Sequence, residues 1–173
     1  YQKREKDMTL WTNMKKELRE KLQNDFSFEM PKIIKREQDE LTEKYLIELK
    51  DNEHIEAVLM RHDYGNSVCE SSQVGCNMGC AFCESGRLKK LRNLETYEMV
   101  CQILLIEEMI NERISSVVIM GIGEPLDNYE NVLNFIKIIN APKGIAIGAR
   151  HITLSTCGLI PKIKELSEVP LQI

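Results

Sequence analysis

The chain has 173 residues and a formal net charge of −4, with 43% hydrophobic and 29% charged residues. This mixture is typical of a globular protein of one domain or one and a half. No apolar run approaches the length of a membrane span, which excludes a membrane-spanning helix, and no signal-peptide pattern is present. The negative charge excludes a global basic field for nucleic acid, although a local basic patch could still bind phosphate.

Six cysteines occur in a chain without a secretory segment. This pattern points to a reducing, cytoplasmic location, where thiols serve more often as metal ligands or catalysts than as disulfides. The first residue is Tyr1, and residues 169–173 read as the beginning of a strand with no turn after it. We therefore expect the sequence to be an internal fragment of a longer protein.

Residues 1 to about 40 are strongly charged and are predicted to be helical, with a second short helix after Pro31. Four apolar residues recur at a four-residue spacing and would form one helical stripe: Leu10, Met14, Leu18 and Leu22. We expect residues 1–42 to form a helical accessory module with a solvated polar face. A dedicated RNA-binding arm is the alternative, but lysine and glutamate nearly balance here.

Residues 43–62 are predicted to form a β-hairpin extension. Strand formers at 45–49 and 55–60 flank a turn signal at Asp51-Asn52. Glu56 lies inside the second apolar strand. Spacing alone favours a solvent-facing residue of the strand alternation at this position.

Three thiols follow the next predicted strand, which covers residues 67–74. Cys76, Cys80 and Cys83 lie within eight residues. Three thiolates can hold three corners of a four-iron four-sulfur cluster and leave the fourth iron open to a small molecule. A closed zinc site is the competing interpretation; its fourth ligand would be Cys69 or His62.

A basic segment runs from Arg87 to Arg92 immediately after the thiols, and it also contains Lys89 and Lys90. One interpretation is a phosphate-contacting patch beside the reactive centre. The other is an ordinary solvated loop.

From residue 67 onward the pattern predicts strands that alternate with helices. Helices are expected at 95–111, 128–140 and 161–167, and strands at 115–120, at 151–156 and at the end of the chain. This order predicts an α/β fold with a parallel sheet.

Active residues should then gather at the carboxyl ends of the parallel strands. Three candidate sites lie there: the Cys76–Cys83 loop, the glycine-rich turn with Gly123 and Glu124, and Ser155. We therefore expect them to form one pocket.

Together these motifs resemble the radical S-adenosylmethionine (SAM) enzymes, and more narrowly the dual-specificity adenine carbon-2 RNA methyltransferases. The resemblance runs from about residue 10 to the end. Three blocks carry it: Cys69–Cys83, Met120–Asn128 and Arg150–Ile163. It implies a partial (βα) radical SAM barrel over residues 63–173, preceded by the helical module and the hairpin.

The resemblance also implies the cofactors. Cys76, Cys80 and Cys83 would hold a four-iron four-sulfur cluster, and SAM would chelate its open iron. Gly123 and Glu124 would hold the methionine part, because a carboxylate facing an ammonium makes a charge-assisted hydrogen bond. Ser155 would also contact SAM. Electron transfer from the cluster would then yield a deoxyadenosyl radical.

The family methylates an adenine carbon that is not nucleophilic, through a methyl group carried by a C-terminal cysteine beyond residue 173. Cys69 matches a second cysteine that releases the product through a transient disulfide; the resemblance thus assigns Cys69 to chemistry rather than to zinc. Glu56 matches the proton acceptor. This chain alone should therefore be inactive.

The implied substrates are an adenosine of 23S ribosomal RNA, at the peptidyl-transferase centre, and tRNA. The implied reductant is a protein such as flavodoxin or ferredoxin, and we expect a monomer without a membrane partner. Lys89 departs from the family pattern, which has glycine there. Carbon-8 methylation of the antibiotic-resistance type therefore stays open, as do a radical enzyme of another substrate class and a zinc-stabilised RNA-binding module without catalysis. Pro125 favours carbon 2.

Overall fold

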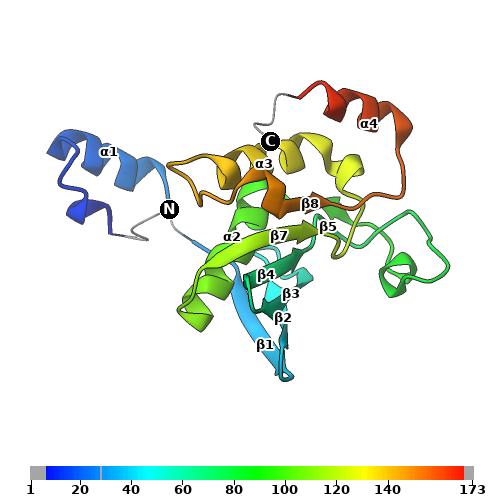
Figure 1. The fold of residues 1–173 in the computed structure, drawn as a ribbon. Helices are drawn as coiled ribbons and strands as arrows, with labels where there is room; N and C mark the ends of the chain where they lie inside the picture. The colour runs from blue at the N-terminus through cyan, green and yellow to red at the C-terminus, as the bar shows by residue number, and fades with distance from the viewer. Residues whose placement is uncertain (1–6, 28, 170–173) are drawn as a thin grey trace.

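The computed structural model describes residues 7–27 and 29–169. A six-stranded mixed sheet lies at its centre, with strand order β1-β2-β3-β4-β7-β8 (Figure 1). Its strands are β1 (Lys32–Gln38), β2 (Thr42–Glu48), β3 (His54–His62), β4 (Gly65–Glu70), β7 (Ile114–Ile119) and β8 (Ile152–Leu154). A separate two-stranded ribbon pairs β5 (Gln73–Val74) with β6 (Arg92–Asn93).

The alternation of strands and helices after residue 65 is confirmed. The order is β4, α2 (Thr96–Ile110), β7, α3 (Tyr129–Asn140), β8 and α4 (Ile160–Ser167). β7 pairs in parallel with both β4 and β8, so the fold is α/β as predicted. The closing strand expected at the end of the chain falls largely on residues 170–173, which lie outside the described residues.

The hairpin of residues 43–62 is also confirmed, since β2 and β3 pair antiparallel with Leu46 opposite Glu56. The helix predicted after Pro31 is wrong: this segment is β1, and it pairs antiparallel with β2. The charged composition favoured a helix, but Ile33 and Ile34 are β-branched and suit a strand. Pairing with β2 satisfies the backbone of β1.

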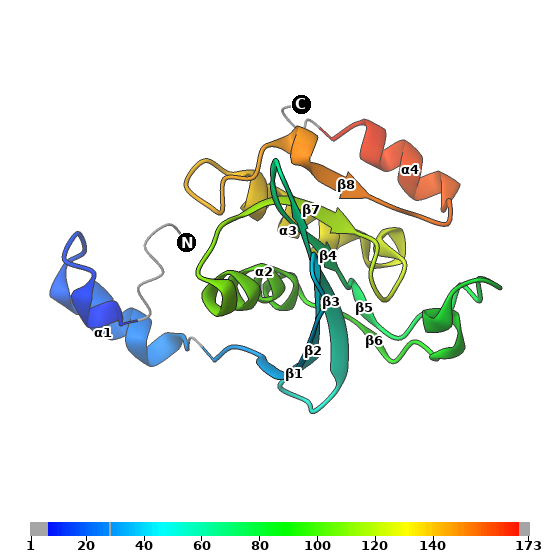
Figure 2. The same cartoon turned by 60° about the horizontal axis from the view of Figure 1, so that its bottom comes forward.

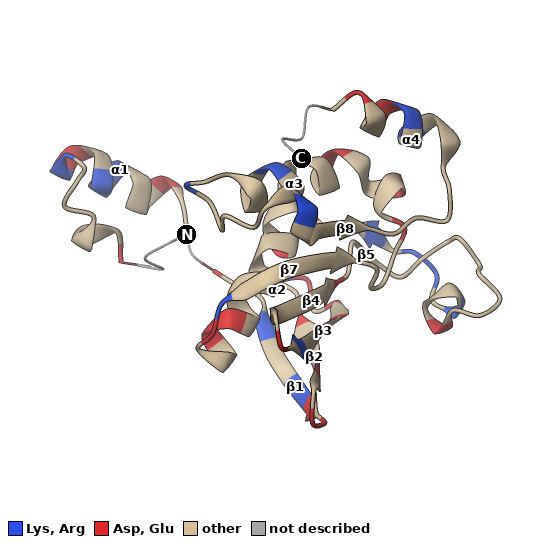
Figure 3. Cartoon of the chain, viewed as in Figure 1, with Lys and Arg blue, Asp and Glu red and all other residues tan. Residues whose placement is uncertain are grey.

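The first residues contain less helix than predicted. They form a 3-10 turn, η1 (Met8–Leu10), and one helix, α1 (Lys16–Asp25), with a break between them. Figures 1 and 2 place α1 away from the sheet, and none of its residues is buried. Figure 3 shows acidic and basic residues interspersed along it. The division of the chain at residues 42 and 62 stays a prediction, although the sheet is continuous across both.

Helices α2 and α3 pack with one face of the sheet into a common core. The core includes Ile55, Leu59 and Val68 from the strands, with Ile103 from α2 and Phe135 from α3. Because side chains alternate along a strand, Glu56 and Cys69 belong to the opposite face, where both are half-buried. Within the described residues, no helix combines the length and the apolar character needed to cross a membrane.

Two buried glutamates on the core face differ in how their charge is satisfied. Glu43, 1% exposed, accepts hydrogen bonds from Arg36 (Nε–Oε2, 2.9 Å), from Arg61 (Nη2–Oε1, 3.0 Å) and from the Tyr45 hydroxyl. Burial opposes its ionisation, but these bonds outweigh burial and lower its pKa. The network thus ties β1, β2 and β3 together.

Glu70, the last residue of β4, has no such partners. It is fully buried, and neither carboxyl oxygen has a hydrogen-bond partner among the described residues. It pairs with Ile119 in β7 and shares the face of Val68, so its surroundings are apolar. Burial raises its pKa well above the ordinary value, and the carboxyl is therefore held neutral in the fold.

Glu70→Met should stabilise the protein at alkaline pH. Because the folded-state pKa is raised above 4.5, the contribution of Glu70 to stability is greatest below that pH and declines as the pH rises towards the folded pKa. The decline is about 1.4 kcal/mol per pH unit between the two pKa values. An apolar side chain removes it, so the melting temperature of the variant should exceed that of wild type at pH 8 and converge towards it at pH 5.

Thermal denaturation at the two pH values measures this effect. The exposed Glu40 provides the control, because Glu40→Gln removes an acid that is already in solvent. Identical pH profiles for wild type and Glu70→Met would refute the assignment.

Candidate active site

The three predicted thiols lie on one loop, which connects β5 and β6 of the two-stranded ribbon and projects outward in Figures 1 and 2. The side chains of Cys76, Cys80 and Cys83 are half-buried, and all three thiols are free. The bonds inside the loop are local, such as Cys83 N–H to the Cys80 carbonyl at 3.1 Å. The loop can therefore adjust around a ligand without disturbing the sheet.

The stem of the loop is held firmly. Cys76 N–H donates to the Leu88 carbonyl at 2.8 Å, and Lys90 N–H donates to Asn77 Oδ1 at 3.1 Å. Gly75 has φ +73°, and a Cβ there would collide with the Lys89 carbonyl. Only glycine lets the two arms of the stem approach this closely.

The donor set fits an iron–sulfur cluster better than zinc. A closed zinc site needs four ligands around one ion at about 2.0–2.3 Å. Among the described residues, no three His, Cys, Asp or Glu side chains converge in this way. His62 pairs with Gly65 at the start of β4, at the opposite end of that strand from the thiol loop, and stacks on Tyr64. Three free thiols on an adaptable loop suit a cluster, whose larger core separates its ligands.

Glu124 follows β7 and is the anionic centre of the site. It is 3% exposed and is the N-cap of the short helix η3 (Pro125–Asn128). Its Oε1 accepts from Thr156 Oγ1 at 2.7 Å and from Leu126 N–H at 2.9 Å; its Oε2 accepts from Cys157 N–H at 2.7 Å. Burial opposes ionisation, but these hydrogen bonds outweigh it and lower the pKa of Glu124. The carboxylate is thus charged and fixed in direction.

Gln73 aligns the glutamate turn with the thiol loop. It is fully buried, and its Oε1 accepts the Glu124 N–H at 2.9 Å. Gly123 has φ +110°, and a Cβ there would lie 2.6 Å from Gln73 Cβ. The glycine is therefore required for this packing.

Ser155 directly follows β8, and its N–H donates to the Ile119 carbonyl at 3.1 Å. The next two residues, Thr156 and Cys157, provide the contacts with Glu124 described above. Neither they nor Gln73 were predicted as site residues. In the sequence, these residues were marked only by their place within the blocks that carry the resemblance. Thr156 and Cys157 follow Ser155 there, and Gln73 lies two residues before Gly75.

Cys157 lies beside the Glu124 carboxylate. A hydrogen bond to Glu124 raises the pKa of its thiol to about 11, together with burial and the nearby charges of Glu124 and Cys80. The thiol loop, Glu124 and Ser155 follow β4, β7 and β8, at the carboxyl ends of parallel strands. That they form one pocket stays a prediction.

Glu56 and Cys69 lie on the same face of adjacent strands. Cys69 is opposite Val58, and Glu56 is two residues from Val58, so the two side chains are diagonal neighbours. Glu56 forms an ion pair with Lys44 (Oε1–Nζ, 2.7 Å). Burial raises the pKa of the Cys69 thiol.

The basic segment is partly used within the molecule. Arg92 binds Glu98 through two contacts of 2.8 Å and Asp51 through one of 2.7 Å, and Lys90 binds Asp127. Arg87 and Lys89 remain exposed.

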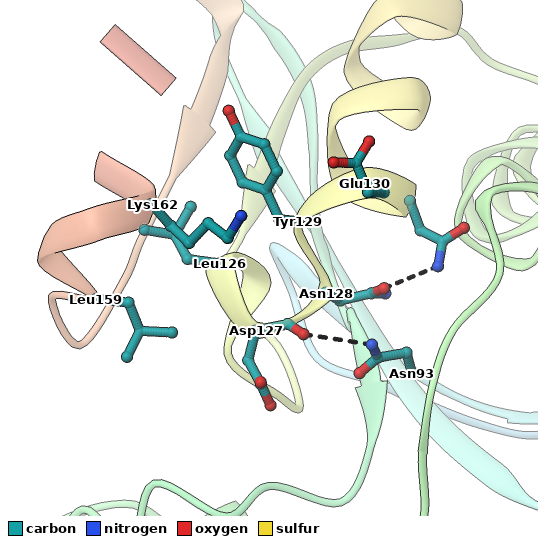
Figure 4. A pocket seen from close by; sticks show the side chains of 9 residues that line it. Asn93, Leu126, Asp127, Asn128, Tyr129, Glu130, Leu159 and Lys162 are labelled. Atoms are coloured by element: carbon teal, nitrogen blue, oxygen red, sulfur yellow. Dashed lines mark hydrogen bonds between the residues drawn. The ribbon is translucent and has the colours of Figure 1, made fainter. Parts of the chain in front are cut away.

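A pocket of about 390 Å³ lies between the start of α3 and α4 (Figure 4). It is lined by Asn93, Leu126, Asp127, Asn128, Tyr129, Glu130, Asn131, Leu159 and Lys162. None of the eight predicted site residues, all of which the structure describes, is among them. The pocket therefore contains none of the predicted site residues, although Leu126 and Asp127 in its lining are bonded to Glu124 and Gln73.

Several relatives match the chain across nearly its whole length. Those from Spiroplasma citri and Bacillus pumilus, both named probable dual-specificity RNA methyltransferase RlmN, are 53% and 52% identical to it. The alignments cover 94% and 100% of this chain but 48% and 49% of the relatives. The chain thus spans about half the length of the curated relatives it matches.

A solved structure and a family model agree with these relatives. The crystal structure of a radical SAM methyltransferase from Sphaerobacter thermophilus superimposes with a TM-score of 0.87 at 35% identity, covering 100% of this chain and 52% of that one. The model of the Radical SAM superfamily matches residues 71–172, and the chain therefore belongs to that superfamily.

Proposed function

We propose that the protein containing this chain is a radical SAM RNA methyltransferase that methylates carbon 2 of an adenosine in 23S ribosomal RNA and in tRNA. The observation that carries the proposal is that the segments on both sides of the three-thiol loop are bonded to the turn of the buried carboxylate Glu124, through Gln73 and through the Lys90–Asp127 ion pair. The names of the relatives, which span about twice this length, supply the substrate class.

The residues of this chain have separable roles in the proposal. Cys76, Cys80 and Cys83 hold the cluster, which supplies the electron that activates SAM. Glu124 accepts a hydrogen bond from the ammonium of SAM, and its partners Thr156 and Cys157 keep the carboxylate charged and oriented. Because these partners are already in place, SAM binding needs little reorganisation here.

Glu56 and Cys69 act on the RNA side of the reaction. Glu56 accepts the proton released from the adenine, and its carboxylate is held by the ion pair with Lys44. Cys69 releases the product by forming a transient disulfide with a cysteine beyond this chain. Their shared sheet face supports this pairing.

Arg87 and Lys89 are the exposed cations of the loop segment, and we assign them to RNA phosphate. Lys90 and Arg92 are excluded from this role because they are partly buried and paired with Asp127 and Glu98. Arg87 pairs only with the exposed Glu84, so its guanidinium stays accessible. An electron-donor protein such as flavodoxin or ferredoxin completes the proposed partners of a cytoplasmic monomer. The position of His62, opposite Gly65 at the far end of β4 from the thiol loop, disfavours it as the fourth ligand of a zinc-stabilised module.

Glu124→Gln should weaken SAM binding while leaving the cluster intact. The substitution preserves size but removes the charge that faces the ammonium, so the dissociation constant should rise about 10- to 100-fold. Equilibrium dialysis against labelled SAM measures affinity, and iron analysis measures the cluster. Glu130→Gln, an exposed acid at the start of α3, is the control. Unchanged SAM affinity in Glu124→Gln would contradict the assigned role.

Cys69→Ala should stop the reaction after the methyl carbon has bonded to the RNA. Without Cys69 the product cannot be released, so the full-length protein should carry covalently attached RNA that migrates with it on a denaturing gel. Cys101→Ala, which removes a buried thiol of α2, is the control and should carry none. Turnover of Cys69→Ala with free methylated product would disprove the role.

Glu56→Gln should slow turnover about 10²- to 10⁴-fold, because it removes the proton acceptor. Mass spectrometry of RNA from cells without the gene, and from cells with each variant, reports product formation and distinguishes carbon 2 from carbon 8. Carbon-8 product would replace the proposed specificity with its alternative. Methylation by Glu56→Gln at the wild-type rate would remove Glu56 from the mechanism.

A further inference from the structure

Lys90 leaves the thiol loop and contacts the helix that Glu124 begins. Its Nζ lies 2.6 Å from Oδ2 of Asp127 in η3, and only 18% of the lysine side chain is exposed. Asp127 N–H in turn donates to the Glu124 carbonyl at 3.1 Å. One ion pair therefore joins the arm that leaves the loop to the glutamate turn.

The same oxygen of Asp127 is shared with the buried glutamine. Gln73 Nε2 donates to Asp127 Oδ2 at 3.0 Å, while Gln73 Oε1 accepts the Glu124 N–H. The path from Lys90 through Asp127 and Gln73 to the Glu124 backbone is thus continuous. Every step is a hydrogen bond of 3.0 Å or shorter.

Lys90 is also fixed to the arm that enters the loop. Its backbone N–H donates to the side chain of Asn77, which directly follows Cys76. The adjacent Gly75 packs against the backbone of Lys89 and Lys90. A displacement of Lys90 would therefore also shift Cys76, the first of the three thiols.

We propose that Lys90 and Asp127 are positioning residues, which hold the thiol loop and the Glu124 carboxylate at the separation that SAM must span. This inference rests on the proposed function, because it presumes a cluster on the thiols and SAM on Glu124. SAM would bind to both sides at once, so its affinity depends on their register.

The burial of the pair favours this role over RNA binding. A phosphate-binding lysine extends into solvent, whereas Lys90 is largely covered and directs its ammonium inward. The hydrogen bonds from Lys90 and Gln73 lower the pKa of Asp127, which keeps the acceptor ionised. A neutral side chain at position 127 would accept the hydrogen bonds from Lys90 and Gln73 less strongly than the carboxylate does.

The test compares two lysines in one segment of the full-length, cluster-loaded protein. Lys90→Met removes the ion pair; Lys89→Met removes the same charge from the exposed neighbouring residue. SAM affinity is measured without RNA by equilibrium dialysis, and the electron paramagnetic resonance spectrum of the reduced cluster is recorded with and without SAM. Iron content and melting temperature are determined for each variant.

Lys90→Met should bind SAM about tenfold more weakly, with wild-type iron content and an unchanged cluster spectrum before SAM is added. Lys89→Met should match wild type within about twofold, and Lys90→Arg should restore most of the loss. Asp127→Asn, which keeps the shape of the side chain, should weaken binding similarly. Adding Lys90→Met to it should cause little further loss, because both changes remove one interaction.

Equal SAM affinity in Lys90→Met and Lys89→Met would overturn the inference while the proposed function stands. Loss of iron from Lys90→Met would also overturn it, since the lysine would then support the loop itself. Weaker RNA binding by Lys90→Met with normal SAM affinity would assign the lysine to phosphate instead. A wild-type protein that loads a cluster but binds no SAM would sink the proposed function, and this inference with it.

Discussion

The buried amide of Gln73 is the interaction on which the candidate site depends. It accepts from the backbone of Glu124 and donates to Asn93 and Asp127, and it is fully enclosed. A buried amide with unmet hydrogen bonds is costly, so the four groups are fixed with respect to one another. Three segments meet there: β5 before the thiols, β6 after them and the turn after β7.

The sheet supports this arrangement through a division of its two faces. Its core face packs on α2 and α3, while the opposite face presents Glu56 and Cys69. The core face tolerates charge only where it is neutralised. Glu43 is stabilised by two arginines and a tyrosine, whereas Glu70 has no partner among the described residues and is held neutral by burial. The unpaired acid sits directly before the segment that positions the site.

Much of the fold could be predicted because its pattern is local. The apolar periodicity of α2 and α3 and the uniform run of β7 identify these elements without any knowledge of their neighbours. The segment after Pro31 was mistaken for a helix because its charged residues hid a strand that forms only by pairing with β2. Strand pairing is a tertiary contact, and composition does not report it.

The candidate site divides in the same way. The residue types and spacing of the three cysteines, and of the glutamate that follows Gly123, indicate their chemistry in the sequence itself. The groups that make the glutamate effective, Gln73, Thr156 and Cys157, are ordinary polar residues whose role arises only when loops meet. Likewise, two members of the basic segment proved to be committed to internal carboxylates. The sequence shows that these side chains are cationic, but it does not show which carboxylates they pair with.

The most direct test of the account uses full-length protein purified without oxygen. Iron and sulfide are counted, and the magnetic spectrum of the reduced centre is recorded before and after SAM bearing ¹⁵N in its amino group is added. The account predicts four irons per chain and a new coupling to the labelled nitrogen, because the iron without a thiolate would bind the amino nitrogen of SAM, whose N–H would face Glu124. A single zinc held entirely by side chains, or a cluster whose spectrum ignores SAM, would contradict it.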